Sequence, residues 1–173
     1  MKRKGFTLIE VIAAISVIAI LAAILVPIVG HAKRTALKRR AMMEMQSIRV
    51  AGLQFYADHG FMPWGDPADP TQTRTGEDKW TSTGTEQANV MRWLTGENPM
   101  KKSYLQIPEK SRSRTNPLIF VDPWGQDYHI GMDRDLNGAV LPDATFCGHD
   151  YINESILVYT LGDPDGGTLL KTF

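Results

Sequence analysis

The longest apolar stretch of the chain lies near its N-terminus. From Phe6 to Val29, 24 residues include a single charged side chain, that of Glu10. A helix of this length extends about 36 Å, enough to cross a hydrocarbon core about 30 Å thick. The pattern therefore predicts a membrane-spanning helix over residues 6–29.

The next segment is periodic rather than uniformly apolar. Between residues 30 and 59, apolar and small residues recur at spacings of three and four: Leu37, Ala41, Met45, Ile48, Gly52 and Phe55. Residues spaced in this way share one face of a helix. We therefore expect the helix to continue as an amphipathic stalk over residues 30–59. It should end at Asp58-His59-Gly60, because glycine commonly follows a helix terminus.

Beyond residue 60, short apolar runs alternate with turn residues. Thr83 and Glu86 have the spacing of a capping box, which predicts a short helix over residues 84–95. Three runs bounded by Asp, Pro, Gly and Asn predict strands of an antiparallel sheet: Leu118–Val121, Tyr128–Met132 and Ile156–Leu161.

The expected fold class is α+β, with a long N-terminal helix packed on a small antiparallel β-sheet. Residues 60–173 form the expected globular head, in which 63–82 and 97–117 are predicted loops because turn-forming residues dominate them.

The zero net charge of the chain conceals two unlike regions. Residues 1–59 carry nine basic and three acidic side chains, whereas residues 60–173 carry ten and 16. The acidic head argues against nucleic-acid binding, despite the basic loop that includes Lys101 and Arg112. A single cysteine, Cys147, excludes an intrachain disulfide scaffold and a Cys/His zinc site.

Glu10 is the unusual feature of the apolar run. A carboxylate at membrane depth costs about 2.5–3.5 kcal/mol, so it requires a partner. A plain signal anchor leaves this residue unexplained. A cleaved secretory signal fits poorly as well, because the apolar run is too long and ends in Pro27, Gly30 and His31.

Residues 4–10, Lys-Gly-Phe-Thr-Leu-Ile-Glu, follow a basic leader and precede the long apolar helix. They closely resemble the type III signal of type IV pilins and type II secretion pseudopilins. The resemblance implies that a prepilin peptidase removes residues 1–5 by cutting after Gly5 and methylates Phe6. It also implies that Glu10 meets the N-terminal amine of a neighbouring subunit in a filament. Pro27 falls where many members have a helix-kinking proline, and it could bend or locally unwind the helix.

A second resemblance lies in the head. Residues 122–128, Asp-Pro-Trp-Gly-Gln-Asp-Tyr, are similar to a turn between the first two strands of the major pseudopilins. Trp124 is expected to pack this turn onto the core. Residues 55–63 and 161–166 resemble the end of the family's stalk and its closing strand. The chain is thus most similar to the major pseudopilin.

The resemblance also implies a location and partners. A pseudopilin crosses the bacterial inner membrane once, holds its C-terminal domain in the periplasm and is extracted into a filament. Its partners are other pseudopilins, the inner-membrane assembly platform and the membrane. The charge pattern alone favours the opposite orientation, because five basic residues follow the span: Lys33, Arg34, Lys38, Arg39 and Arg40. They could face anionic lipid headgroups, acidic neighbouring subunits or solvent.

The acidic head also contains a candidate calcium loop. Asp133, Asp135, Asn137 and Gly138 reproduce the first half of such a loop, but its twelfth position is Ala144 instead of glutamate. Many major pseudopilins bind calcium in a later loop, which corresponds to residues 161–167 here, although this chain lacks the longer acidic continuation usual in that loop. The predicted Ca²⁺ ligands are therefore Asp133, Asp135, Asn137, Asp163 and Asp165, and the alternative is a set of solvated Asx turns.

No catalytic residue is predicted, because Ser155, His149 and Cys147 lie in no nucleophile motif. The expected function is that of a structural subunit of a type II secretion pseudopilus, which drives protein export. A type IV pilin for adhesion, motility or DNA uptake is the first alternative. A membrane-anchored binding module is the second.

Overall fold

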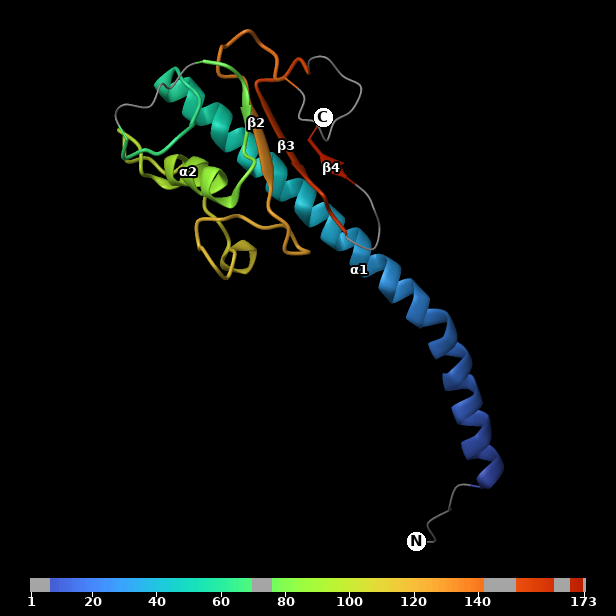
Figure 1. Ribbon diagram of the computed structural model, residues 1–173. Coiled ribbons are helices and arrows are strands. Elements are labelled where there is room, and N and C mark those ends of the chain that lie inside the picture. The colour runs from blue at the N-terminus through green and yellow to red at the C-terminus, as the bar shows by residue number, and fades with distance from the viewer. Residues whose placement is uncertain (1–6, 70–75, 142–151, 164–168, 173) are drawn as a thin grey trace. The chain divides into compact units, whose positions relative to one another are not determined.

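The computed structural model describes residues 7–69, 76–141, 152–163 and 169–172 (Figure 1). The chain divides into two units, Met1–Leu37 and Lys38–Phe173. Its elements, in chain order, are α1 (Leu8–His59), β1 (Lys79–Trp80), α2 (Gly84–Thr95), a 3-10 turn (Glu109–Ser111), β2 (His129–Met132), β3 (Ile156–Thr160) and β4 (Leu170–Lys171).

The first unit contains the apolar part of α1. The described side chains from Thr7 to Arg34 are all exposed, and an 18-residue window has a mean hydropathy of 3.0. The helix is therefore long and apolar enough to cross a membrane. The helical backbone continues through Pro27, so the locally unwound alternative for this proline is not observed.

The second unit begins within α1, at Lys38. It contains a four-stranded sheet in the order β1-β2-β3-β4, in which every neighbouring pair is antiparallel. The β2 and β3 strands pair over four residues, from His129 opposite Tyr159 to Met132 opposite Ile156. The predicted α+β class, with a long N-terminal helix and a small antiparallel sheet, is confirmed.

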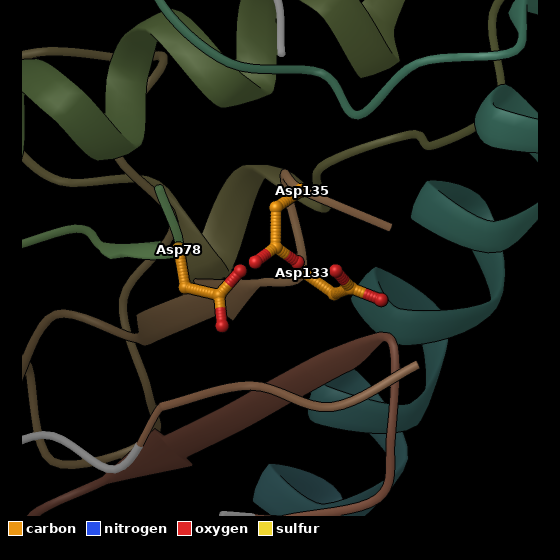
Figure 2. A group of neighbouring side chains, drawn as sticks. All are labelled: Asp78, Asp133 and Asp135. Carbon is orange, nitrogen blue, oxygen red and sulfur yellow. The ribbon is translucent and has the colours of Figure 1, made fainter. Parts of the chain in front are cut away.

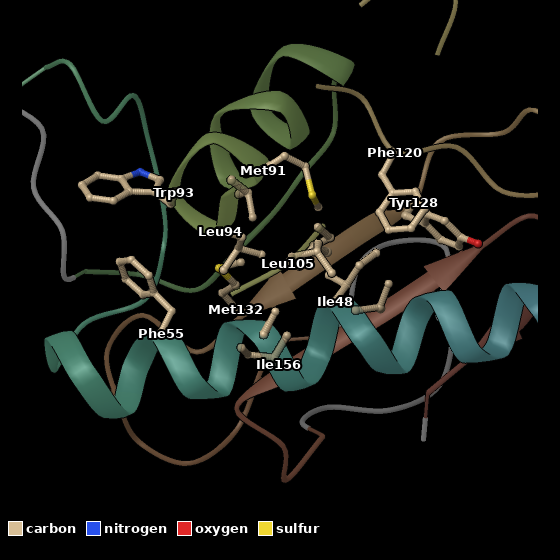
Figure 3. Close-up of a cluster of buried hydrophobic side chains, with 14 of the residues drawn as sticks. Ile48, Phe55, Met91, Trp93, Leu94, Leu105, Phe120, Tyr128, Met132 and Ile156 are labelled. Atoms are coloured by element: carbon tan, nitrogen blue, oxygen red, sulfur yellow. The ribbon is translucent and has the colours of Figure 1, made fainter. Parts of the chain in front are cut away.

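One hydrophobic core joins α1, α2 and the sheet (Figure 3). Five of the six predicted stripe positions on α1 are buried, from Ala41 to Phe55, while Leu37 is only partly buried. Because strand side chains alternate between faces, β2 and β3 contribute every second residue to this core. Its main members are Met45, Ile48 and Phe55 of α1, Met91, Trp93 and Leu94 of α2, and Ile130, Met132, Ile156 and Val158 of the sheet.

The predicted capping box starts α2. The Thr83 hydroxyl accepts the Glu86 amide at 3.2 Å, and the Glu86 carboxylate accepts the Thr83 amide at 3.1 Å. Burial raises the pKa of Glu86, but four hydrogen bonds from Ser82 and Thr83 outweigh it and hold the pKa below its ordinary value. The helix boundaries 84–95 are as predicted.

The strand prediction is only partly correct. Leu118–Val121 is not a strand, because Phe120 and Val121 make only isolated bridges, with Arg112 and Asp127. The Val121 amide instead bonds the Ser111 carbonyl, and a turn begins at Asp122. The edge strands β1 and β4 were not predicted, since two residues are too few to show an alternating pattern.

The turn after Val121 is held by its first side chain. One Asp122 carboxylate oxygen accepts the amides of Trp124 and Gln126, both at 2.8 Å, and the other accepts the Thr160 hydroxyl at 2.7 Å. Gly125 has a φ of 87°, which suits glycine. The expected core role of Trp124 is wrong: this residue is only partly buried. Phe120 and Tyr128, on either side of the turn, enter the core instead.

A buried polar network ties α1 to this turn. Glu44 is 8% exposed and accepts hydrogen bonds from Arg40 at 2.9 Å, Ser111 at 2.7 Å and the Tyr128 hydroxyl at 2.7 Å. Burial, followed by the hydrogen bond to Glu44, raises the pKa of Tyr128 far above its ordinary value. The tyrosine therefore remains a hydrogen-bond donor, and the carboxylate is compensated inside the core.

The end of α1 is fixed by charges and rings. Asp58 accepts hydrogen bonds from Lys102 at 2.5 Å and Tyr104 at 2.7 Å. The hydrogen bond from Lys102, then the one from Tyr104, lowers the pKa of Asp58. Burial and the contact with Asp58 raise the pKa of Tyr104 to about 12. The Phe55 and His59 rings stack with centroids 4.1 Å apart, which completes this junction.

Candidate processing and assembly site, and candidate metal centre

In the first turn of α1, the carboxylate of Glu10 is hydrogen-bonded to Thr7 of the same chain. The amide and the hydroxyl of Thr7 both donate to Glu10 Oε2, each at 2.7 Å. In return, the Glu10 amide donates to the Thr7 hydroxyl at 3.4 Å. This is the reciprocal arrangement of a capping box, and it satisfies backbone donors that a helix start leaves free.

Thr7 was not predicted as part of this site. The signal was present, because Thr7 and Glu10 have the same spacing as Thr83 and Glu86, which did reveal a capping box. Within the part of the chain that the structure describes, Glu10 has hydrogen-bond donors but no cationic partner.

The other predicted processing and assembly residues lie elsewhere. Gly5 and Phe6 fall outside the described residues, so the cleavage point stays a prediction. Pro27 lies within α1, 17 residues after Glu10, which corresponds to about 25 Å along a helix. The two residues are therefore separate features of one helix and do not form a shared site.

Three carboxylates come together beside the end of β2. Oxygen atoms of Asp78, Asp133 and Asp135 all lie within 4.8 Å of one another, and Figure 2 shows the three side chains side by side. Asp78 precedes β1, and the pairing of Lys79 with Met132 brings it next to Asp133. The sequence pattern does not reveal Asp78 as a neighbour of Asp133, because their proximity depends on the pairing of the two-residue strand β1 with β2.

Backbone and side-chain amides already surround these carboxylates. Asp78 accepts the amides of Arg134 and Leu141, both at 3.0 Å. Asp133 accepts those of Asn137 at 3.2 Å and Gly138 at 2.8 Å, and Asp135 accepts the Asn137 amide at 3.1 Å. These are the contacts of Asx-type turns, the alternative to a calcium site.

The five predicted calcium ligands are therefore only partly brought together. Asp133 and Asp135 join Asp78, whereas the Asn137 carboxamide is engaged locally, with Asp135 and with the Ala139 amide. Asp163 is not in this group, and Asp165 lies outside the described residues. Burial, with contributions from Asp135 and Asp78, raises the pKa of Asp133. Carboxylate oxygens suit hard cations, so Ca²⁺ binding here stays a prediction.

Comparison with known proteins adds one finding. The family model described as the prokaryotic N-terminal methylation motif matches residues 1–26. No curated protein and no solved structure matches the chain. The matched motif implies processing by a prepilin peptidase and assembly into a filament, and its family consists of structural pilin-type subunits. This match over the N-terminal residues, together with the apolar N-terminal helix and the small antiparallel sheet, supports a type IV pilin-like or pseudopilin-like protein with a membrane anchor at its N-terminus.

Proposed function

We propose that the chain is a non-enzymatic subunit of a type II secretion pseudopilus, a periplasmic filament whose growth drives protein export. The methylation motif at the start of a helix long enough to cross a membrane carries the filament part of the proposal. The choice of secretion rests on the turn at residues 122–128, whose sequence resembles the major pseudopilin turn.

The apolar part of α1 serves two environments in turn. Before assembly its exposed side chains contact lipid. In a filament, the same side chains pack against the helices of other copies and bury comparable apolar surface. The exchange replaces one apolar environment by another, so extraction from the membrane requires no exposure of the whole span to water.

Glu10 fixes the axial offset between the packed helices of neighbouring copies. In the isolated chain its carboxylate is held by Thr7, which lowers the cost of placing it in lipid. Cleavage after Gly5 creates a new α-amine on Phe6. The amine of a neighbouring copy then offers Glu10 an ion pair, which is stronger at low dielectric than a neutral hydrogen bond. Only one axial offset between copies brings the two charges together.

Substitution of Glu10 tests the assembly step. The Glu10→Ala variant should be cleaved and methylated normally, because residues 1–6 are unchanged, but it should form few or no filaments. Mass spectrometry of the mature chain and electron microscopy of sheared filaments measure the two outcomes. Ser16→Ala is a matched control, since Ser16 also lies in the apolar part of α1 and donates a local hydrogen bond to the Ile12 carbonyl at 2.8 Å. Normal filaments from the Glu10 variant would refute the pairing.

A gene deletion separates secretion from the alternatives. Loss of exported proteins from the culture medium, restored by the intact gene, supports the pseudopilus. Retained secretion with lost surface filaments, motility or DNA uptake assigns a type IV pilin instead. A membrane-anchored binding module would leave both filaments and secretion unchanged.

A further inference from the structure

The loop that follows β2 carries an exposed leucine beside a carboxylate. Leu136 is 40% exposed, and its φ of 61° lies in the left-handed region, which a leucine rarely adopts. Its neighbour Asp135 is also exposed and makes no ion pair with any residue that the structure describes. The loop therefore presents an apolar side chain and a negative charge together.

Hydrogen bonds within this loop hold it in one shape. The Asp133 carboxylate accepts the amides of Asn137 at 3.2 Å and Gly138 at 2.8 Å, which closes the segment that contains Leu136. A loop that is already fixed loses little conformational freedom when it binds. Asp135 and Leu136 are therefore preorganised for contact with another molecule.

A pocket of matching chemistry lies between the end of α2 and the segment at residues 103–118. Its volume is about 420 Å³, within the range of about 300–1,000 Å³ for pockets that bind ligands. Leu105 and Ile107 of the hydrophobic core line it, together with Pro117 and Leu118. These side chains suit an apolar group such as that of leucine.

One arginine gives the pocket a positive charge. Arg112 lines it and is fixed by a hydrogen bond from its Nε atom to the Ile107 carbonyl at 3.1 Å. Within the part of the chain that the structure describes, this arginine makes no ion pair. Lys110 and Arg114 of the same segment are exposed as well, and Glu109 is its one acidic residue. A guanidinium in this setting suits a carboxylate partner.

The leucine and the pocket belong to opposite ends of β2. Arg112 bridges Phe120, which precedes the turn into β2, whereas Leu136 lies four residues beyond the last residue of the strand. Figure 1 shows the corresponding loops, yellow and orange, at the two ends of this strand. A contact between them therefore joins different copies. Such a contact is heterologous, so it can repeat from copy to copy without closing.

We propose that Leu136 of one copy enters the pocket of the next copy, while Asp135 pairs with Arg112. The proposal rests on the filament assembly proposed above and adds a specific contact between the heads of neighbouring copies. The leucine buries apolar surface in the pocket, and the ion pair between carboxylate and guanidinium orients it. Every copy carries both surfaces, so one kind of contact serves the whole filament.

A photoreactive residue in place of Leu136 tests this contact in the full chain. p-Benzoylphenylalanine keeps a large apolar side chain at this position. Irradiation of cell membranes and of sheared filaments should produce cross-linked dimers, and mass spectrometry should map the cross-link to Leu105, Ile107, Pro117 or Leu118. The same replacement of Leu141 is the matched control, because Leu141 is 42% exposed and also follows β2. It should give none of these cross-links.

Charge reversal tests the ion pair. Arg112→Asp and Asp135→Arg should each reduce the cross-link from position 136 at least about tenfold, because like charges then face each other. The double variant should regain most of the yield, since the two charges are exchanged. A folding defect in either single variant would not be repaired by the second change, because the two residues lie at opposite ends of β2. Arg114→Asp is the control and should preserve the yield.

Several results would overturn the contact. Absence of the cross-link, a cross-link that maps outside the pocket, and equal pocket cross-links from positions 136 and 141 are three. A double variant that stays as weak as the single variants is a fourth. Normal filaments without the cross-link contradict this contact alone. A lack of filaments from the intact chain contradicts the proposed assembly, and the cross-link in membranes still decides the contact.

Discussion

Asp133 is consistent with two interpretations of the acidic loop, a set of Asx turns and a cation site. It is 2% exposed, accepts two backbone amides and lies against two other carboxylates. Amide hydrogen bonds stabilise the carboxylates as turn residues, whereas the closeness of three negative charges favours a cation. The two interpretations differ in what calcium does to stability.

Calcium removal provides the first test at the residue scale. If the group holds Ca²⁺, millimolar CaCl₂ raises the Tm of the full chain in detergent and EDTA lowers it, and Asp78→Asn abolishes the difference. Asx turns alone predict no change with EDTA. On either interpretation, Asp133→Ala should destabilise the fold by about 1–2 kcal/mol, because the partly buried Gly138 amide loses its acceptor, while the Asn137 amide keeps its bond to Asp135. Urea unfolding measures this loss.

Acid stability is the second test at this scale. The contacts from Lys102 and Tyr104 lower the pKa of Asp58, so the folded state binds its proton less tightly than the unfolded state. The resulting stabilisation is complete above the unfolded-state pKa of about 3.9 and is lost as pH falls through the lower folded-state value. The Tm of Asp58→Asn should be below that of the intact chain at pH 6, and the gap should close below pH 4. A gap that is constant with pH would contradict this account.

At the scale of elements, the contact between β1 and β2 depends on a glycine. A Cβ on Gly131 would lie 2.6 Å from ring atoms of Trp80, which is pinned by a hydrogen bond from its indole nitrogen to the Leu141 carbonyl at 2.6 Å. Gly131→Ala should therefore destabilise the fold by about 1–3 kcal/mol, as measured by urea unfolding.

A double variant identifies the cause. In a Trp80→Ala background the ring is absent, so Gly131→Ala should cost much less than in the intact chain. An equal cost in both backgrounds would mean that backbone conformation, and not the ring, requires glycine there.

The sequence predicted the elements that have a long or well-marked pattern. The apolar stripe from Ala41 to Phe55 predicted the second part of α1, and the Thr83–Glu86 capping box predicted α2. Short apolar or alternating runs between turn residues predicted β2 and β3. The strand predicted over residues 118–121 was wrong, because apolar residues beside a turn resemble a strand in sequence. Only the hydrogen-bond partners of the segment, which the sequence does not show, distinguish the two. Asp78 could not be placed, since only the pairing of β1 with β2 brings it to Asp133.

At the scale of the whole molecule, the compact unit does not begin where the predicted head does. It starts at Lys38, and α1 supplies Met45, Ile48 and Phe55 to its core. We expect a fragment of residues 38–173 to unfold cooperatively in urea without detergent. A fragment of residues 60–173 should lack a cooperative transition, because the sheet loses the helix that covers it. Tryptophan fluorescence during urea unfolding distinguishes the two, and similar transitions would contradict the prediction.

The two edge strands of the sheet affect how readily copies of the chain aggregate at high protein concentration. The edge strands β1 and β4 each contain two residues, and each carries a lysine, Lys79 or Lys171. Short edges with a charged side chain offer little backbone for pairing with another strand, which is how natural proteins resist aggregation. These two edges therefore disfavour cross-β association when many copies are crowded together.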